Sequence, residues 1–439
     1  MIDTHKLKKR DLYLNKIIAF QDTEPVKVVT GIRRCGKSSL LKLMKLHLQE
    51  TGIADDQILE MNFESYAFKN MNSDSFYKYV SQHIVPNKRM YFFFDEVQRV
   101  PGWEDAVNSF RVDFNCDIYI TGSNAYMLSS EYATYLSGRC IEIKMLPLSF
   151  SEFIPFHDLE IRETKNSFGG IRKQVFDKAG EHYELQEVFD AYMRFGGMPG
   201  IADIGLDQEK ALILLDGIYS TVIMRDILER ENRRGQKRIT DPVLLKKITM
   251  FLADNIGSNI SISSIGNTLS NEGLLSNNKR KKSPSTHTVQ AYVNALLEAY
   301  FFYEIKRFDI KGKEFLRTLG KYYIVDIGLR NYLLGFRNRD SGHAIENVVY
   351  FELLRRGYDV SIGKIGNSEV DFIATKADDK IYIQVTEAMT SEDVRKRELA
   401  PLQKINDNYE KIILSLNPGM DSSYEGIKSI YLIDWLIDG

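Results

Sequence analysis

The feature that most constrains the fold is an eight-residue stretch at positions 31–38, which reads Gly-Ile-Arg-Arg-Cys-Gly-Lys-Ser. It follows an apolar, strand-like run at 26–30 and opens a helix-like run at 39–49. The two glycines allow backbone angles that side chains forbid, so that successive N–H groups can turn inward toward an anion. The helix that follows directs the positive end of its dipole to the same place. The stretch therefore predicts a phosphate-binding loop between a strand and a helix.

The same stretch supplies the residues expected to contact a nucleotide. Lys37 would reach the β- and γ-phosphates, and the Ser38 hydroxyl would coordinate Mg²⁺. ATP and Mg²⁺ are therefore the expected cofactors, and Lys37 is also a candidate catalytic residue. The candidate nucleotide-binding residues of the loop are Gly31, Ile32, Arg33, Arg34, Cys35, Gly36, Lys37, Ser38 and Ser39.

A second apolar run, 90–94, ends in two carboxylates, Asp95 and Glu96. A continuous apolar run of this kind is typical of a central parallel strand that is covered on both faces. Asp95 would hold the Mg²⁺ opposite Ser38, and Glu96 would orient and deprotonate the attacking water. Together with the loop at 31–38, this pair indicates hydrolysis of a nucleoside triphosphate rather than binding alone.

A third strand-like run, 117–121, is followed by Gly122, Ser123 and Asn124. In an open parallel sheet the carboxyl ends of the strands line the ligand crevice. A polar side chain there can contact the γ-phosphate or its water, so Asn124 or Ser123 is the candidate sensor of the γ-phosphate. A Ser-Asn turn is also an ordinary helix cap. The alternation of strands and helices over residues 1–150 predicts a doubly wound α/β fold.

The composition is that of an ordinary globular protein of 439 residues with a net charge of −2. Because the chain has no overall positive charge, a nucleic-acid site would have to be a local basic patch. No apolar run is long enough to span a bilayer, and the polar N-terminus does not resemble a signal peptide. The three cysteines, Cys35, Cys116 and Cys140, show no metal-binding spacing. We therefore expect a cytoplasmic protein of roughly two to four domains, without a membrane partner.

The motifs above are joined by Thr-Gly-Ser-Asn at 121–124, Ser-Gly-Arg at 137–139 and Leu-Pro-Leu-Ser-Phe at 146–150. Together they make the chain resemble, over essentially its whole length, a large prokaryotic family of AAA-type ATPases with a C-terminal nuclease-like domain of unknown function. The resemblance implies a five-stranded AAA core over 1–150, with the catalytic glutamate on the strand beside the phosphate loop. It also implies a homo-oligomer, which is expected to be a hexamer.

The resemblance further places an arginine finger at the end of the helix before the fifth strand, and Arg139 matches that position. Such an arginine contacts the γ-phosphate bound by a neighbouring subunit, so that hydrolysis depends on assembly. An arginine near a helix C-terminus is also favoured by the helix dipole alone. The sequence leaves both interpretations of Arg139 open.

Residues 151–240 are expected to form a helical lid, in which the polar stretch 166–180 would be a mobile insertion. The resemblance places a Gly-x-Pro of the lid near the adenine, which makes Gly197 and Pro199 candidate nucleotide-binding residues. Two glycines and a proline after a helix are also an ordinary helix stop.

Residues 241–335 predict three helices followed by a hairpin, the order of elements in a winged helix-turn-helix. A basic loop precedes the third helix, and both the loop and the start of that helix could contact DNA phosphates. A winged helix used only for protein packing is the alternative. The candidate DNA contacts are Lys279, Arg280, Lys281, Lys282, Thr286 and His287.

Residues 336–439 alternate between helix and strand and resemble the PD-(D/E)xK nuclease fold, a restriction-endonuclease-like α/β domain. The matching residues are Glu346, Asp371, Gln384 and Thr386, and Glu369 is a further acidic candidate. The amide of Gln384 brings no negative charge to a metal, and Thr386 cannot supply the cation expected at the lysine position. Because phosphodiester cleavage needs metals held by several carboxylates, we expect a nuclease fold without nuclease activity.

The sequence thus predicts an oligomeric ATPase in which hydrolysis reshapes contacts with DNA. Branched DNA is the first substrate to test, because the nuclease resemblance includes junction-binding proteins. The alternative is a nucleotide-dependent switch that scaffolds a protein partner in signalling or defence. An active nuclease is a third interpretation, and the incomplete set of metal ligands disfavours it.

Overall fold

The structure is a computed structural model that describes residues 7–125, 138–165, 171–229, 239–271, 284–337, 341–418 and 422–438. The chain forms two compact units. Unit 1 comprises Met1–Pro147 with Glu298–Tyr300, and unit 2 comprises Leu148–Leu297 with Phe301–Gly439. The chain therefore first passes from unit 1 into unit 2 between Pro147 and Leu148.

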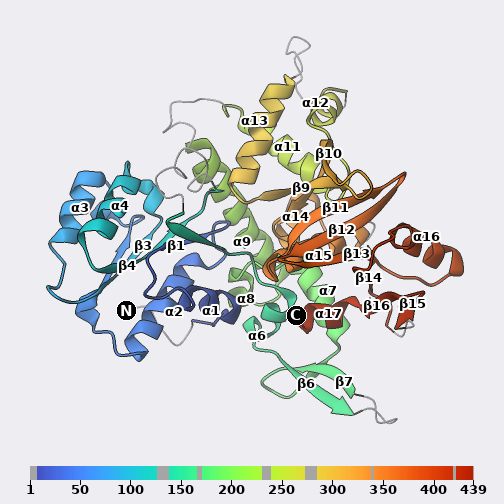
Figure 1. Ribbon diagram of the computed structural model, residues 1–439, viewed down its shortest axis with the longest axis horizontal. Helices are drawn as coiled ribbons and strands as arrows, with labels where there is room; N and C mark the ends of the chain where they lie inside the picture. The colour runs from blue at the N-terminus through green and yellow to red at the C-terminus, as the bar shows by residue number, and fades with distance from the viewer. Residues whose placement is uncertain are drawn as a thin grey trace. The chain divides into compact units, whose positions relative to one another are not determined.

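Unit 1 is built on a five-stranded parallel sheet with the strand order β2-β3-β4-β1-β5 (Figure 1). This sheet confirms the expected α/β core with five strands. The helix expected before the fifth strand falls almost wholly outside the described residues, because residues 126–137 are not described. The strands are β1 (Val26–Thr30), β2 (Ile58–Asn62), β3 (Met90–Asp95), β4 (Cys116–Gly122) and β5 (Cys140–Lys144), and the helices are α1 (Asp11–Ile18), α2 (Lys37–Glu50), α3 (Ser73–Ser81) and α4 (Trp103–Asp113).

The centre of this sheet is buried on both faces. Every residue of β1 and of β3 is buried, as the apolar run at 90–94 predicts. Aromatic rings pack β3 against α3 and α4: the ring centroid of Phe76 lies 4.8 Å from that of Phe94 and 5.1 Å from that of Phe110, both edge-on. Burying a phenylalanine contributes roughly 1.5–3 kcal/mol. This packing fixes the end of β3, where Asp95 lies.

One expectation about this sheet is wrong. The resemblance implied that the strand of the catalytic glutamate lies beside the strand of the phosphate loop, but β4 lies between β3 and β1. β4 pairs with both neighbours, with Ile120 opposite Val28 and Ile118 opposite Phe92. The carboxyl end of β4 is therefore held between the phosphate loop and Asp95.

Unit 2 begins with a helix, a small sheet and a group of helices. The sheet is antiparallel and has the order β6-β7-β8. The polar stretch that was expected to be a mobile insertion instead contains β7, whose backbone pairs with β6; residues 166–170 lie outside the described part. The elements are α6 (Phe150–Phe156), β6 (Glu160–Lys165), β7 (Ile171–Phe176), β8 (His182–Tyr183), α7 (Leu185–Phe195), α8 (Gly200–Ile204), α9 (Gln208–Thr221) and the π-helix η6 (Val222–Glu229).

Three helices and a hairpin follow in the predicted order. The first helix begins at Asp241, whose carboxylate accepts hydrogen bonds from the N–H groups of Val243 and Leu244. The hairpin strands are antiparallel, with a register shift between Phe315 and Gly320. The elements are α11 (Pro242–Asp254), α12 (Ile262–Asn271), α13 (Thr286–Glu298), β9 (Phe302–Asp309) and β10 (Glu314–Ile324).

The hairpin is the edge of an eight-stranded sheet with the order β10-β9-β11-β12-β13-β14-β16-β15 (Figure 1, orange to red). β9 pairs in parallel with β11, with Arg307 opposite Ile362. The sheet therefore crosses the expected boundary between residues 335 and 336, because strand pairing joins the hairpin to the strands beyond it. The other elements are α14 (Ile327–Leu334), α15 (Ser341–Arg355), β11 (Asp359–Ile365), β12 (Ser368–Lys376), β13 (Asp379–Thr386), α16 (Glu392–Gln403), β14 (Glu410–Ser415), β15 (Ser423–Tyr424), β16 (Ile427–Tyr431) and α17 (Leu432–Ile437).

Helix α15 packs on the eight-stranded sheet through aromatic rings. The ring of Tyr350 stacks on Tyr323 of β10 at 5.0 Å and on Phe372 of β12 at 6.3 Å between centroids. Glu346 lies one turn before Tyr350 on the same face of α15, and its carboxylate accepts a hydrogen bond from the Tyr323 hydroxyl of β10 at 3.1 Å. Across the described ranges, no helix combines the length and the apolar character needed to cross a membrane.

Candidate nucleotide-binding site

The loop after β1 has a backbone that only glycine can follow at its ends. Gly31 has a φ of +140°, and a Cβ at this position would lie 2.1 Å from the carbonyl oxygen of Met145. Gly36 has a φ of +107° and is the N-cap of α2, with no side-chain cap. Because the N-cap residue has no side chain to cap the helix, the N-terminus of α2 can accept an anion.

Lys37 is the first residue of α2 and its side chain is buried, with 4% exposed. The ammonium donates hydrogen bonds to the carbonyl oxygens of Gly31 and Ile32, at 3.0 and 3.1 Å. Both acceptors are neutral backbone groups of the loop itself. The loop therefore holds a buried positive charge beside the open end of a helix dipole.

Asp95 lies at the carboxyl end of β3 and is buried. Its carboxylate accepts hydrogen bonds from the Thr121 hydroxyl at 2.5 Å and from the Asn62 amide at 3.2 Å, and it also bonds the Ser38 hydroxyl. Burial raises the pKa of Asp95, although the hydrogen bonds from Thr121 and Ser38 oppose that rise. The structure thus brings Asp95 and Ser38 together.

The groups around Ser38 and Asp95 fit a magnesium ion. The Ser38 hydroxyl and the Asp95 carboxylate are hard oxygen ligands, whereas Asn62 directs its amide nitrogen at Asp95 and its oxygen at the Glu64 N–H. A pocket of about 50 Å³ beside them is also lined by Lys45 and Glu60. In the described part of the chain, no group of three or more histidine, cysteine, aspartate or glutamate side chains is arranged to hold a metal. An ion here would therefore take its remaining ligands from water and from a bound phosphate.

Glu96 follows β3 directly and is buried, in a left-handed conformation with a φ of +56°. Its N–H donates to the Thr121 hydroxyl oxygen at 2.9 Å, and its carboxylate accepts hydrogen bonds from Gln98 at 2.5 Å and from Ser123 at 3.3 Å. A positive φ is costly for a residue with a side chain and persists only where the surroundings impose it. These contacts hold the Glu96 carboxylate near the carboxyl end of β4.

The end of β4 supplies the link between these groups. Thr121 donates to Asp95 and accepts from the Glu96 backbone, and Ser123 contacts the Glu96 carboxylate. Asn124 is the next residue and is also buried, with 8% exposed. Because β4 lies between β1 and β3, these side chains lie between the phosphate loop and the acidic pair.

The sequence analysis missed three of these residues: Thr121, Asn62 and Gln98. Thr121 and Asn62 lie at the carboxyl ends of β4 and β2, so the rule that ligands bind at this edge of a parallel sheet could have found them. Gln98 lies in a short 3-10 turn, Val97–Arg99, and no sequence signal indicates that its amide reaches back to Glu96.

The remaining residues of the phosphate loop differ in how much of each is exposed to solvent. Ile32 and Cys35 are fully buried, and burial raises the pKa of the Cys35 thiol. Arg33 forms an ion pair with Glu64, the residue that follows Phe63 after β2. Arg34 is exposed and has a φ of +64°. Ser39 is exposed on the first turn of α2.

Arg139 lies in the turn before β5, and its side chain is exposed. Its carbonyl oxygen accepts a hydrogen bond from the N–H of Val26, the first residue of β1, at 2.9 Å. The phosphate loop follows the other end of β1, which is roughly 13 Å away along the strand. Arg139 therefore lies at the opposite edge of the sheet from the phosphate loop of its own chain.

Gly197 and Pro199 lie in unit 2, where they pack against other parts of that unit. The N–H of Gly197 donates to the Asp326 carboxylate at 2.6 Å, and a Cβ on Gly197 would lie 2.3 Å from the Leu148 carbonyl oxygen. Pro199 is the N-cap of α8. The close approach of Leu148 explains why residue 197 is a glycine. A contact with adenine stays a prediction.

The candidate nuclease residues are joined by a lysine that the sequence analysis did not single out. Lys321 of β10 is buried, and its ammonium lies 2.8 Å from the Glu369 carboxylate and 3.5 Å from that of Glu346. Burial opposes a charged lysine, but Glu346, Asp371 and Glu369 outweigh it and raise the pKa of Lys321. We call Lys321 and these three acidic residues the carboxylate cluster.

Two acidic members of the carboxylate cluster, Asp371 and Glu346, have pKa values shifted in opposite directions. Burial raises the pKa of Asp371 well above its usual value, and the neighbouring Glu346 adds to the rise; its carboxyl accepts a hydrogen bond from the Val385 N–H at 2.8 Å. For Glu346, burial is outweighed by the hydrogen bond from His343 and the charge of Lys321, so its pKa is lowered. The cluster therefore pairs one ammonium with Glu346 and Glu369.

Gln384 and Thr386 lie on β13 beside the carboxylate cluster. The Gln384 amide donates to Glu398 at 3.4 Å, while its oxygen is buried without a hydrogen-bond partner. The Thr386 hydroxyl donates to the Ala388 carbonyl at 3.4 Å. Neither side chain supplies a charge, as the sequence predicts.

The candidate DNA contacts are only partly described. Lys279, Arg280, Lys281 and Lys282 lie outside the described residues. Thr286 and His287 are exposed in the first turn of α13, where the Ser285 hydroxyl accepts a hydrogen bond from the Thr288 N–H at 3.1 Å.

Comparison with known sequences agrees with the geometry of unit 1. Residues 23–154 match the family model of an AAA domain, and residues 186–340 match a domain of unknown function. A phosphate loop and an acidic pair on a parallel sheet are what an AAA-type ATPase domain contains, and this chain carries such a domain. The second match crosses both the 240/241 and the 335/336 boundaries that the sequence analysis expected.

One relative aligns with almost the whole chain and establishes the family to which the chain belongs. The chain is 38% identical over 430 residues to an uncharacterized protein of Haemophilus influenzae, with 98% of each chain covered, and it belongs to the family of that protein. An uncharacterized protein of Methanocaldococcus jannaschii is 29% identical over 413 residues, with 92% of this chain and 84% of the relative covered. A Walker-type ATPase of Pyrococcus abyssi aligns at 16% identity with a TM-score of 0.47, over 74% of this chain and 95% of that chain.

Proposed function

We propose that this protein binds ATP with Mg²⁺ at the 31–38 loop and hydrolyses it. The observation that carries the proposal is the Lys37 ammonium, which is buried at the open N-terminus of α2 and held by two neutral carbonyls. A phosphate oxygen would offer this ammonium a charged partner, and charge-assisted hydrogen bonds are about twice as strong as neutral ones. The loop is therefore poised to exchange its own carbonyls for phosphate.

The surrounding side chains have the chemistry that hydrolysis needs. When bound, ATP and Mg²⁺ supply the phosphoanhydride bond and the cation that neutralises it. Ser38 and Asp95 would hold the cation, and Glu96 would accept a proton from the attacking water. Ser123 contacts Glu96 directly, which supports a role for Ser123 in orienting this carboxylate and leaves Asn124 to contact the γ-phosphate.

The test is to compare nucleotide binding and hydrolysis in Glu96→Gln. This change keeps the shape of the side chain but removes the base, so hydrolysis should fall by about 10²–10⁴-fold while ATP still binds. Glu50→Gln, at the exposed end of α2, is the matched control and should hydrolyse ATP normally. Normal hydrolysis by Glu96→Gln would exclude Glu96 as the base.

We propose further that hydrolysis is completed by Arg139 of a neighbouring copy in a homo-oligomer. The position of Arg139 at the opposite end of β1 from its own loop supports this, because its side chain is exposed there. Arg139→Ala should then bind ATP but lose hydrolysis. Mixing it with an excess of Lys37→Ala chains should restore hydrolysis, because a Lys37→Ala neighbour presents an intact Arg139 to the intact loop of an Arg139→Ala chain. Normal hydrolysis by Arg139→Ala alone would reject the arginine finger.

DNA is the partner that we propose for unit 2. The exposed Thr286 and His287 at the start of α13 support it, together with the basic sequence at 279–282. Binding to junction, duplex and single-stranded DNA should be measured over a range of salt, because phosphate contacts strengthen as salt falls. Absence of binding at low salt would reject a DNA role.

The alternative is a nucleotide-dependent switch that recruits a protein. A pocket of about 580 Å³ in unit 2, lined by Phe189, Phe195 and Phe336 among others, favours it. Pockets of this size and character accept apolar side chains. The Glu96→Gln chain, purified from native cells, should carry DNA under the first proposal and a protein without DNA under the second. Both proposals take the cytoplasm as the location.

A further inference from the structure

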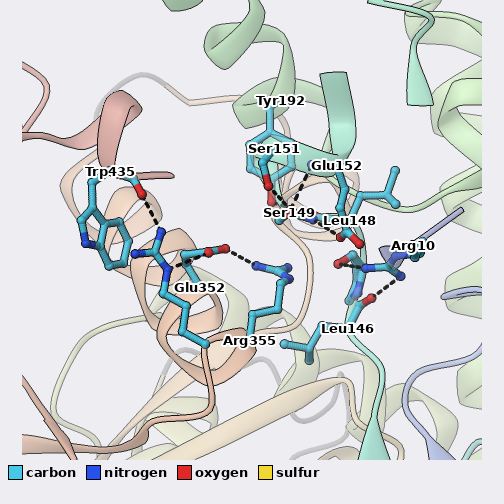
Figure 2. A network of polar contacts seen from close by, with 12 residues as sticks. Arg10, Leu146, Leu148, Ser149, Ser151, Glu152, Tyr192, Glu352, Arg355 and Trp435 are labelled. Carbon is cyan, nitrogen blue, oxygen red and sulfur yellow. Dashed lines mark hydrogen bonds and ion pairs between the residues drawn. The ribbon is translucent and has the colours of Figure 1, made fainter. Parts of the chain in front are cut away.

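Arg10 joins the phosphate loop to the segment that leaves unit 1. Its side chain is buried, with 4% exposed, although it carries a full charge. The guanidinium donates to the carbonyl oxygen of Leu146 at 2.8 Å (Figure 2). It also donates to the carbonyl oxygen of Cys35 at 3.1 Å and to that of Pro147 at 3.2 Å. One planar group with fixed donor directions thus holds three carbonyls from two segments far apart in sequence.

The phosphate-loop end of this link is the carbonyl of Cys35. It precedes Gly36 and Lys37, whose backbone forms the N-terminus of α2. The carbonyls of Gly31 and Ile32 accept from Lys37, whereas the carbonyl of Cys35 accepts from Arg10. Any rearrangement of the loop backbone when phosphate enters would therefore move an acceptor of Arg10.

The other end of the link is held as firmly. Tyr13, one turn into α1, accepts a hydrogen bond from the Leu146 N–H at 3.1 Å, and its ring lies 4.6 Å from the Arg10 guanidinium carbon. The segment also touches the loop itself, since the Met145 carbonyl is the atom that a Cβ on Gly31 would meet. Residues 145–147 and the phosphate loop are thus packed and hydrogen-bonded together within unit 1.

The chain is fixed again immediately on entering unit 2. The Leu148 N–H donates to the Gly197 carbonyl at 2.7 Å. The Tyr192 hydroxyl donates to the Leu148 carbonyl at 3.0 Å (Figure 2). Ser149 then begins α6 with a capping box to Glu152. Pro147, whose carbonyl accepts from Arg10, is followed directly by Leu148, whose backbone is hydrogen-bonded to Gly197 and Tyr192 of unit 2.

We propose that Arg10 is a positioning residue that couples nucleotide binding at the phosphate loop to the backbone of the junction at residues 146–148. The inference rests on the proposed function, since it assumes that ATP binds at the loop. In this proposal, ATP bound at the phosphate loop changes the hydrogen bonding of Leu146 and Leu148, and the Arg10 guanidinium transmits this change. Unit 2 would then respond to the nucleotide through the chain itself.

The experiment is backbone hydrogen exchange over residues 142–150 of the full chain, with and without a non-hydrolysable ATP analogue and Mg²⁺. Nucleotide binding is measured separately on the same samples. The variants are Arg10→Met, which removes all three bonds, and Arg10→Lys, which keeps the charge but not the planar fork. Lys9→Met, at the exposed neighbouring residue, is the matched control.

We expect the nucleotide to change exchange at Leu146 and Leu148 in the unaltered chain and in Lys9→Met. In Arg10→Met the analogue should still bind, while the change at the junction falls by about tenfold or more. Arg10→Lys should show a partial response, and it carries the test if Arg10→Met does not fold. In hydrolysis, kcat should fall more than KM rises, because the loop still binds ATP.

Two results would overturn the inference while leaving the proposed function intact. One is nucleotide binding by the unaltered chain without any change at the junction. The other is a full junction response in Arg10→Met. If the unaltered chain does not bind the analogue at all, the proposed function fails, and the coupling fails with it.

Discussion

Two buried lysines of this chain, Lys37 and Lys321, have the same exposure and opposite surroundings. Each side chain is 4% exposed. Lys37 is held by two neutral carbonyls, whereas Lys321 lies within 3.5 Å of two carboxylates, those of Glu346 and Glu369. The charge of Lys37 is free to attract an anion, and the charge of Lys321 is already neutralised. Burial and residue type therefore do not decide the function of a lysine here; the charge of its partners does.

The largest effect on stability should come from Lys321→Met. Removing one partner of a buried ion pair leaves an uncompensated charge and costs about 3–5 kcal/mol. Here that charge belongs to Glu346 and Glu369. The same change at Lys37 removes two hydrogen bonds to neutral carbonyls, which are worth about 1 kcal/mol each, and a longer-range attraction to Asp95. Denaturant unfolding of both variants measures the difference, with Lys306→Met on the exposed face of β9 as the control. Equal losses of unfolding free energy in Lys37→Met and Lys321→Met would show that the charge of the partners does not set the cost.

The second effect should be a partial rescue. If the cost of Lys321→Met is the unpaired carboxylate of Glu346, adding Glu346→Gln should restore about 1–3 kcal/mol, the range of coupling between residues in contact. The double-mutant cycle reads this value from the free energies of unfolding. Additive losses would mean that Lys321 stabilises the sheet through packing rather than charge.

Asp326 is a third buried titratable group, and its carboxyl is held by backbone N–H groups instead of by a charged side chain. Asp326 accepts hydrogen bonds from Gly197 at 2.6 Å and Leu329 at 3.0 Å, yet burial outweighs these bonds and raises its pKa to about 6. The folded chain therefore keeps a proton that the unfolded chain releases at a lower pH. Its contribution to stability is largest below the unfolded pKa and is lost as pH rises to about 6.

The measurement is the free energy of unfolding of the unaltered chain minus that of Asp326→Asn, between pH 4 and 7. We expect this difference to shrink by roughly 2–3 kcal/mol as pH rises through that window and then to level off. Asp207→Asn, at the exposed N-cap of α9, controls for the loss of a cap. A difference that grows with pH would show that the backbone N–H groups outweigh burial.

The smallest effect should come from Arg33→Ala. Arg33 belongs to the phosphate loop, but its guanidinium pairs with Glu64, whose side chain is 36% exposed. A pair this exposed contributes about 0–1 kcal/mol, and the backbone of the loop is unchanged. We expect ATP affinity to change by less than about threefold. A larger loss of affinity, measured by titration, would assign Arg33 to the nucleotide.

The phosphate loop could be predicted from sequence because its parts are local. Gly31, Gly36, Lys37 and Ser38 lie within eight consecutive residues, and the loop geometry follows from their backbone requirements. The acidic pair after β3 could be predicted for the same reason, since a fully apolar strand ends there. Strand order is a non-local property, so the position of β4 between β3 and β1 could not be read from the chain, and neither could the role of Thr121.

The residues that match the nuclease pattern could be predicted only in part. Glu346, Asp371, Gln384 and Thr386 could be picked out by their order along the chain, but the charge missing at Thr386 has a counterpart on another strand. Lys321 lies 25 residues before Glu346 and reaches it only because β10 joins the same sheet. Because the sequence predicted a domain boundary between residues 335 and 336, it placed Lys321 in a different domain from Glu346 and gave no reason to pair them.

The most direct test of the account is to compare ATP binding by Lys37→Met and Lys321→Met in the presence of Mg²⁺, under conditions where both variants are folded. We predict that Lys37→Met weakens binding by about a hundredfold, the effect expected when hydrogen bonds to a charged group are lost. Lys321→Met should bind ATP within about threefold of the unaltered chain. Unchanged affinity in Lys37→Met would contradict the assignment of the phosphate loop as the nucleotide site.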